Sequence, residues 1–135
     1  NEPSHHIPYL YNYTNTPHKT QALVDYILRT LYHNDPNGLS GNEDVGQMSA
    51  WYVLSSMGFY SFCPGKPAYE IGRPLFDKVT IHLDNGKDFV IRAENNSIEN
   101  KYVRSMKLNG RELEEPRFSH FDLMKGGELV LEMEK

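Results

Sequence analysis

The chain has 135 residues, and its 14 basic and 18 acidic side chains leave a formal charge of −4 at pH 7. An acidic balance gives no general attraction to phosphate backbones, so we expect no nucleic-acid partner. No apolar run approaches the ~20 residues that a membrane-spanning helix needs. The single cysteine excludes an intrachain disulfide and a cysteine-rich zinc site.

The N-terminal segment combines prolines with side chains that are able to bind ligands. The chain begins at Asn1 without a methionine or a signal-like apolar segment, so we expect it to be a piece of a longer protein. Residues 1–18 contain three prolines and predict irregular structure. The tyrosines of this segment, Tyr9, Tyr11 and Tyr13, are expected to fill the core.

Two helices are expected in the first half of the chain. Thr16 suits a helix N-cap, and apolar side chains then recur at three- and four-residue spacing until the turn at 35–38. This pattern predicts a helix over 16–34. A second pattern, over 44–57, is apolar on nearly every side and ends at Gly58, a suitable left-handed cap. We therefore expect the second helix to be buried.

The rest of the chain has the pattern of β-strands. Val79–Leu83 alternates apolar and polar side chains, and turn residues separate the other short apolar segments. In the last segment, Leu129, Leu131 and Met133 are expected to face one side. The fold class is therefore α+β, with an antiparallel, sandwich-like strand region over 68–134.

The loop ahead of the second helix holds the densest group of candidate functional residues. Asn42, Glu43 and Asp44 lie between Gly41 and Gly46. Capping of the helix by Asn42 or Asp44 is the commoner reason for such residues at a helix start. Two carboxylates beside an aromatic helix also suit acid–base chemistry or sugar binding. Spacing alone leaves both interpretations open.

Glu2, His5 and His6 form a second group of candidates. Adjacent histidines point in different directions and lack the usual spacing of metal ligands, so a pair of surface histidines is the ordinary interpretation. The Glu2 carboxylate suits a hard cation or a sugar hydroxyl. Nothing in the local sequence decides among these roles.

Several segments carry a resemblance to a known family. Gly41–Trp51, with the sequence GNEDVGQMSAW, resembles the signature of the family 92 glycoside hydrolases, the bacterial exo-acting alpha-mannosidases. Asn1–Tyr11 is similar to another active-site loop of that family, and Gly58–Gly65 and Ser119–Gly127 also fit it. The resemblance covers the whole chain.

The resemblance implies a place in a larger architecture. The family pairs an N-terminal β-sandwich with an (alpha/alpha)6 barrel, and this chain is similar to its C-terminal end. Residues 1–65 would then hold the last helices of the catalytic barrel, and residues 66–135 would form an antiparallel, β-sandwich-like tail. The partners would be a mannose-containing glycan and the remainder of the parent polypeptide, exported to the periplasm or surface of a bacterium.

The resemblance also implies an activity. The parent would be a calcium-dependent exo-alpha-mannosidase that hydrolyses terminal bonds, alpha-1,2 in particular, with inversion. Asp44 matches the family's catalytic base. Asn42 stands where the family often has a second aspartate, so its supporting role departs from the pattern, and Glu43 would be a neighbouring polar contact. The general acid would lie outside these residues, so the isolated chain is expected to be inactive.

The resemblance assigns Glu2, His5 and His6 to contacts with the sugar, with Glu2 as a calcium ligand. The alternative function is a non-catalytic module that binds carbohydrate or protein. Because a piece of a barrel would uncover a surface that its parent buries, we expect Met48, Trp51 or the pair Tyr9 and Tyr11 to be partly exposed, or to be covered by a second copy of the chain.

Overall fold

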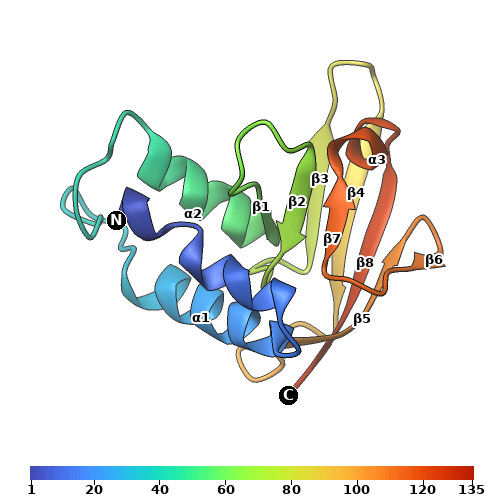
Figure 1. The fold of residues 1–135 in the computed structure, drawn as a ribbon, viewed down its shortest axis with the longest axis horizontal. Coiled ribbons are helices and arrows are strands. Elements are labelled where there is room, and N and C mark those ends of the chain that lie inside the picture. Colours follow the sequence, from blue (N-terminus) through green and yellow to red (C-terminus); the bar gives the residue numbers. More distant parts are fainter.

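A computed structural model describes residues 1–135 of the chain, from two short 3₁₀ helices to a long final strand. The 3₁₀ helices are η1 (Glu2–Ser4) and η2 (Ile7–Tyr13), and they occupy the segment expected to be irregular. Figure 1 shows these helices and the two longer ones on one side of the molecule and the strands on the other. The mixed α+β class is thereby confirmed.

The two longer helices are α1 (Pro17–Thr30) and α2 (Gln47–Met57), and both are shorter than predicted. Helix α1 ends before residue 34 because Tyr32 forms an isolated β-bridge with Leu39, which closes the turn between them. Helix α2 is not buried all round, since the Val53 side chain is 53% exposed.

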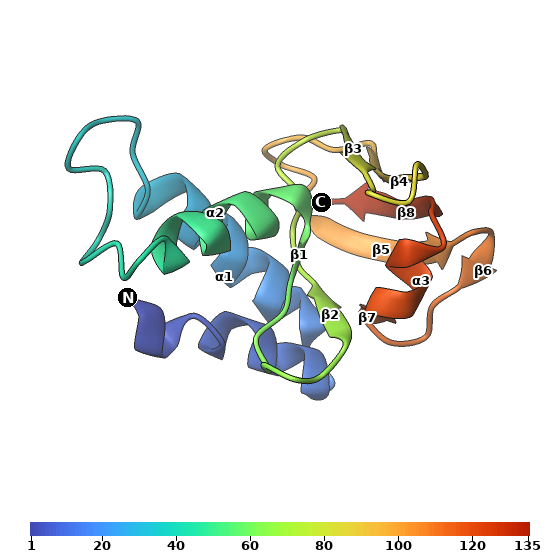
Figure 2. The same ribbon diagram turned by 90° about the horizontal axis from the view of Figure 1, so that it is seen from above.

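Eight strands form two sheets (Figure 2). The three-stranded sheet has the order β1-β2-β7, and the five-stranded sheet has the order β3-β4-β8-β5-β6. Their bounds are β1 (Phe59–Tyr60), β2 (Ala68–Ile71), β3 (Lys78–His82), β4 (Asp88–Glu94), β5 (Tyr102–Leu108), β6 (Arg111–Glu112), β7 (Arg117–Ser119) and β8 (Gly127–Glu134). A short helix, α3 (His120–Met124), links β7 to β8.

The expectation of a purely antiparallel strand region is wrong at one pairing. Strand β8 lies between β4 and β5 and pairs parallel to β4 but antiparallel to β5. A strand that enters between two neighbours of opposite direction must run parallel to one of them. Hairpin turns in the sequence indicate only local antiparallel pairs, so they could not show this insertion.

The sandwich-like packing of the strands is observed. Side chains of both sheets share one core, and Leu129, Leu131 and Met133 of β8 all face it, as predicted. Aromatic contacts join the two sheets, because Phe118 of β7 stacks on Phe89 of β4 at a centroid distance of 5.6 Å. The core is closed by Leu123 of α3.

A second, aromatic cluster lies among the helices and contains Tyr9, Val24, Leu28, Trp51 and Tyr60. Tyr9 is 0%, Trp51 1% and Met48 2% exposed, so the expected exposure is not found at these three residues. Tyr11, the fourth named residue, is partly exposed, so the exposure expected of at least one of them is present there alone. The chain's own helices and β1 cover this cluster. None of the helices combines the length and apolar character that a membrane crossing requires.

Candidate active site

The loop that precedes α2 has an unusual backbone. Three successive residues, Asp44, Val45 and Gly46, have positive φ angles of 54°, 57° and 91°. Glycine adopts this conformation freely, but each of the other two residues is strained there by about 1–2 kcal/mol. Strain of this kind is retained mainly at functional sites, where the backbone must aim a side chain. The loop therefore holds Asp44 in a fixed direction that ordinary helix formation would not require.

The expected capping of α2 by Asn42 or Asp44 is not observed. The N-cap residue is Gly46, which has no side chain, and no side-chain hydrogen bond is made from that position. Instead the Glu43 carboxylate accepts a hydrogen bond from the Ser49 backbone N–H, at 3.2 Å. Asn42 is exposed and Asp44 is half-buried. Because Glu43 takes the capping contact, the Asp44 carboxylate remains free for another task.

A cleft of ≈ 260 Å³ opens beside this loop. The cleft brings together Glu2, His5 and His6 with Gln47, the first residue of α2. Strand β1 and the segment that follows β1 form the other wall. The lining residues are Glu2, His5, His6, Gln47, Tyr60, Ser61, Phe62 and Pro64. Residues that are about 40 positions apart in the sequence thus share one cleft, as expected for a ligand site.

His5 is the most firmly held residue of the cleft. Its ring stacks on Trp51, with centroids 5.3 Å apart and planes inclined by 23°. The Trp51 indole N–H donates a hydrogen bond of 3.0 Å to the His5 backbone carbonyl. The Gln47 amide nitrogen lies 3.3 Å from His5 Nδ1 and 2.6 Å from the Tyr60 hydroxyl oxygen. Stacking and hydrogen bonds together fix the imidazole in the cleft wall.

The electrostatics link the loop to the cleft. Burial lowers the pKa of His5, and the nearby Asp44 carboxylate opposes that effect. Burial likewise raises the pKa of Tyr60, and the Glu2 carboxylate adds to that shift. The Asp44 carboxylate therefore lies close enough to His5 to alter the pKa of its imidazole. The Glu2 carboxylate likewise lies close enough to Tyr60 to alter the pKa of its hydroxyl. At neutral pH the cleft presents a neutral imidazole and a neutral phenol beside the Glu2 carboxyl group, whereas Asp44 is not among its lining residues.

The chain does not form a metal site by itself. No group of three or more His, Cys, Asp or Glu side chains converges closely enough to hold an ion. Glu2 is exposed at the cleft and offers one carboxylate, whereas His5 and His6 offer imidazole nitrogens, which calcium does not favour. A hard cation at this cleft would need further oxygen ligands beyond those of these residues.

Five cleft residues were not singled out from the sequence: Gln47, Tyr60, Ser61, Phe62 and Pro64. Gln47 lies within the signature segment and the other four within Gly58–Gly65, so the family resemblance reached them without giving them a role. The sequence pattern could not show that these residues share a cleft, because Tyr60 belongs to a strand of only two residues.

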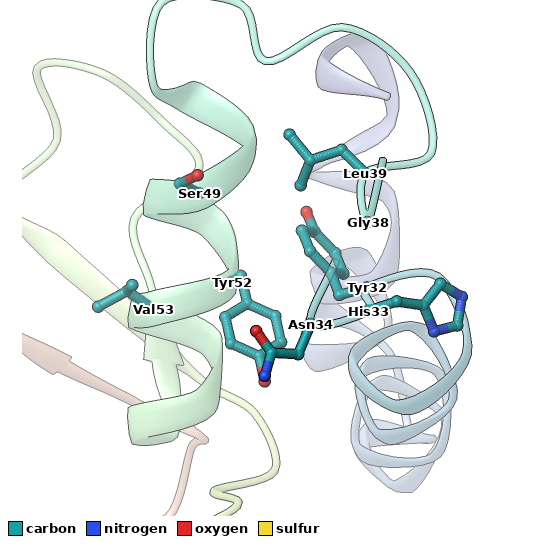
Figure 3. A pocket seen from close by; sticks show the side chains of 8 residues that line it. All are labelled: Tyr32, His33, Asn34, Gly38, Leu39, Ser49, Tyr52 and Val53. Carbon is teal, nitrogen blue, oxygen red and sulfur yellow. The ribbon is translucent and has the colours of Figure 1, made fainter. Parts of the chain in front are cut away.

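A larger cavity of ≈ 410 Å³ lies on another face of α2 (Figure 3). Figure 3 shows Ser49, Tyr52 and Val53 on α2 opposite Tyr32 and Leu39 of the segment after α1. No carboxylate lines this cavity. Its titratable lining is limited to the His33 imidazole and two tyrosines, Tyr32 and Tyr52, so it is the weaker candidate for an active site.

The smaller cleft has the composition of a site that acts on sugars. Carboxylates are the groups that catalyse glycoside hydrolysis, and histidine, glutamine and tyrosine side chains supply hydrogen bonds and apolar faces for a pyranose. Side chains of these kinds suit a carbohydrate-binding site. More particularly, the chain belongs to glycosyl hydrolase family 92: the family model of its catalytic domain matches residues 1–135.

Solved structures agree with this family membership. A GH92 alpha-mannosidase from Bacteroides thetaiotaomicron is similar at 40% identity and a TM-score of 0.93, over 99% of this chain and 18% of that one. Its complex with mannoimidazole has also been solved. A GH92 inverting mannosidase of the same organism is 48% identical, with a TM-score of 0.90, over 98% of this chain and 18% of that one.

A curated relative from Arthroderma benhamiae, named an uncharacterized secreted glycosidase, is 31% identical over 138 residues. The match covers 100% of this chain and 18% of the relative. The chain thus spans about a fifth of the length of the relatives that it matches.

Proposed function

We propose that the chain is part of an inverting exo-alpha-mannosidase and that Asp44 is the general base. The observation that carries this proposal is the conformation of the loop, in which Asp44 is half-buried on strained backbone while Glu43 makes the helix-capping contact. A residue that serves only as a cap has no need of such strain. Family membership and the inverting mannosidase among the similar structures support the reaction class.

The reaction follows from the chemistry of inversion. Asp44 accepts a proton from a water molecule while that water attacks the anomeric carbon, and the glycosidic oxygen leaves from the opposite face of the sugar. The leaving oxygen takes a proton from a carboxylic acid about 6.5–9.5 Å from the base. Glu43 is next to Asp44 in the chain and is engaged with Ser49, so we assign the acid to the rest of the parent polypeptide. The isolated chain is then inactive.

We assign the other predicted residues to the bound sugar. Glu2, His5 and His6 line the cleft and are placed to contact its hydroxyl groups. Asn42 has a supporting role beside the base. His5 contributes a neutral hydrogen-bonding group, because burial lowers the pKa of its imidazole. These roles depend on a sugar lying in this cleft.

We further propose that the parent enzyme requires calcium. Glu2 would be one oxygen ligand, and the others would come from the sugar hydroxyl groups and from the remainder of the enzyme. A bound calcium ion would polarise hydroxyl oxygens of the sugar. Within this chain, no group of three or more His, Cys, Asp or Glu side chains converges to complete the site.

The finer features of the parent are part of the same proposal. Residues 1–65 would close an (alpha/alpha)6 catalytic barrel and residues 66–135 would be its strand-rich tail. The preferred bond would be alpha-1,2, in a mannose-containing glycan. The parent would be exported to the periplasm or surface of a bacterium, and the name of the Arthroderma benhamiae relative supports the secretion alone.

Proton NMR of the first product tests the function. The purified parent enzyme is mixed with an alpha-1,2-linked mannobiose, and the anomeric signals are followed before mutarotation. An inverting exo-enzyme releases beta-mannose first. Initial release of alpha-mannose would contradict inversion, and binding of mannosides without hydrolysis would favour the non-catalytic module. Equal rates on all linkages would refute the alpha-1,2 preference alone.

A further inference from the structure

Gln47 has a position in the cleft that the proposed reaction does not explain. It is the first residue of α2, and its amide group lies between the His5 ring and the Tyr60 hydroxyl. The amide nitrogen is 3.3 Å from His5 Nδ1 and 2.6 Å from the Tyr60 oxygen. An amide nitrogen carries hydrogens and donates only. Both neighbouring atoms therefore accept hydrogen bonds from Gln47.

This contact fixes the tautomer of His5. A neutral imidazole carries one hydrogen, and a nitrogen that accepts a hydrogen bond cannot also hold it. When Gln47 donates to Nδ1, the hydrogen of His5 must be on Nε2. Burial favours this neutral form, because it lowers the pKa of His5. The Asp44 carboxylate acts on the ring, and the Tyr60 hydroxyl is reached through Gln47.

The Nε2 atom is free to bind a ligand. No hydrogen bond within the chain involves it, yet it is not among the fully enclosed side-chain atoms that lack a partner. His5 as a whole is only 8% exposed and lines the cleft. Stacking on Trp51 and the contact with Gln47 at the ring edge favour one orientation of the imidazole. Its single free donor therefore has a defined direction.

We propose that Gln47 is a positioning residue that keeps the hydrogen of neutral His5 on Nε2, from which it donates a hydrogen bond to a hydroxyl group of the bound mannoside. This inference rests on the proposed function. Gln47 acts through His5, so its loss weakens substrate binding while the proton transfer at Asp44 continues. The donor also discriminates among sugars, because a mannoside that lacks the contacted hydroxyl loses this hydrogen bond.

A Gln47→Glu substitution in the parent enzyme tests the inference by reversing the contact. The new carboxylate can only accept, so it draws the His5 hydrogen to Nδ1 and raises the pKa of His5. Above that pKa the Nε2 atom becomes an acceptor and the substrate loses its donor. Below it the imidazolium carries hydrogen on both nitrogens and the donor returns. The KM relative to the unaltered enzyme should then rise about 3- to 10-fold with increasing pH, the scale of one neutral hydrogen bond, with kcat changing less.

Gln47→Met is the matched control. Its side chain has similar length but neither donates nor accepts strongly, and a free neutral imidazole favours hydrogen on Nε2, so KM should rise less than in Gln47→Glu and without a step in pH. With monodeoxy mannosides, the unaltered enzyme should lose about 3- to 10-fold in kcat/KM for one particular hydroxyl, and Gln47→Glu above the pKa of His5 should nearly abolish that difference. Thermal unfolding of each variant verifies that the fold is retained.

The outcomes separate the two proposals. If the Gln47 amide oxygen instead accepts a hydrogen bond from Nδ1–H, a carboxylate reproduces that contact and the KM of Gln47→Glu stays unchanged at all pH values. An unchanged KM, or a rise without pH dependence, would overturn the tautomer assignment while mannoside hydrolysis by the unaltered enzyme upholds the proposed function. Absence of hydrolysis by the unaltered enzyme would overturn both.

Discussion

Replacement of Asp44 by asparagine in the parent enzyme separates catalysis from structure. The amide has nearly the size of the carboxylate, and asparagine tolerates the left-handed conformation that Asp44 adopts at φ 54°. Helix α2 loses no cap, because its N-cap is Gly46 and the side-chain contact comes from Glu43. We therefore expect the free energy of unfolding to change by less than about 0.5 kcal/mol.

Turnover should respond very differently. An amide cannot accept the proton of the attacking water, and loss of a positioned base typically costs roughly 10²–10⁴-fold in rate. That range corresponds to ~3–5 kcal/mol in the barrier, since each tenfold change equals about 1.36 kcal/mol. The prediction is thus a large fall in kcat with an unchanged melting temperature and unchanged affinity for a mannoside inhibitor.

The assay is steady-state hydrolysis of an alpha-mannoside, with calorimetric binding of mannoimidazole to each variant. Glu43→Gln is the control, because glutamine can still accept the hydrogen bond from Ser49 and should keep turnover within a few-fold. Near-normal turnover of Asp44→Asn would refute the catalytic role. If Glu43→Gln alone abolished hydrolysis, the base would be the neighbouring carboxylate.

Three further results are expected. Glu2→Gln should raise the calcium concentration for half-maximal activity about tenfold, because a neutral oxygen replaces a charged one; an unchanged titration would remove Glu2 from the ligands. Asp25→Asn should lower the free energy of unfolding by about 3 kcal/mol in denaturant. The reason is that Arg73, whose side chain is 1% exposed, loses the carboxylate that lies 3.0 Å from its Nε. A loss below about 1 kcal/mol would show that this ion pair is unimportant for stability. Burial raises the pKa of Tyr32 to about 12, with Glu43 adding to the shift. The stability gained from its neutral form is complete below pH ~10 and is lost as the pH rises through the raised pKa, so alkaline unfolding should become less steep in Tyr32→Phe.

The parts of the fold that depend on local pattern could be predicted from the sequence. The alternation of Val79–Leu83 and of the last strand follows from one buried and one solvent-facing side, and both strands form as expected. Helix α2 ends at Gly58, whose φ of 110° is unfavourable for other residues. Each of these features is set by a few neighbouring residues.

Features that depend on distant partners could not be predicted. Helix α1 buries Gln21 and Asp25 beside Val24, although a polar side chain normally marks the solvent face. Gln21 accepts a hydrogen bond from the Val103 backbone N–H, and Asp25 pairs with Arg73. The burial of each polar side chain is therefore offset by a partner far along the chain. The short strands β1 and β7 likewise exist only through their pairing with β2.

The candidate site shows the same division. The signature segment was enough to select Asp44, and the structure adds that Glu43, not Asp44, contacts the backbone of α2. The meeting of Gln47, Tyr60 and His5 results from three elements packing together, which no spacing in the sequence reveals. The catalytic and binding roles of the selected residues stay predictions.

The most direct test of the central claim is rescue of an Asp44→Ala variant of the parent enzyme by azide. Removal of the side chain leaves room for this small anion on the face where the base would activate water, and azide attacks the anomeric carbon without needing a base. With an activated alpha-mannoside, we expect the variant to accumulate beta-mannosyl azide and the unaltered enzyme to form none. Formation of alpha-mannosyl azide, or no azide product from a variant that still binds mannoimidazole, would contradict the assignment of Asp44 as the base of an inverting mannosidase.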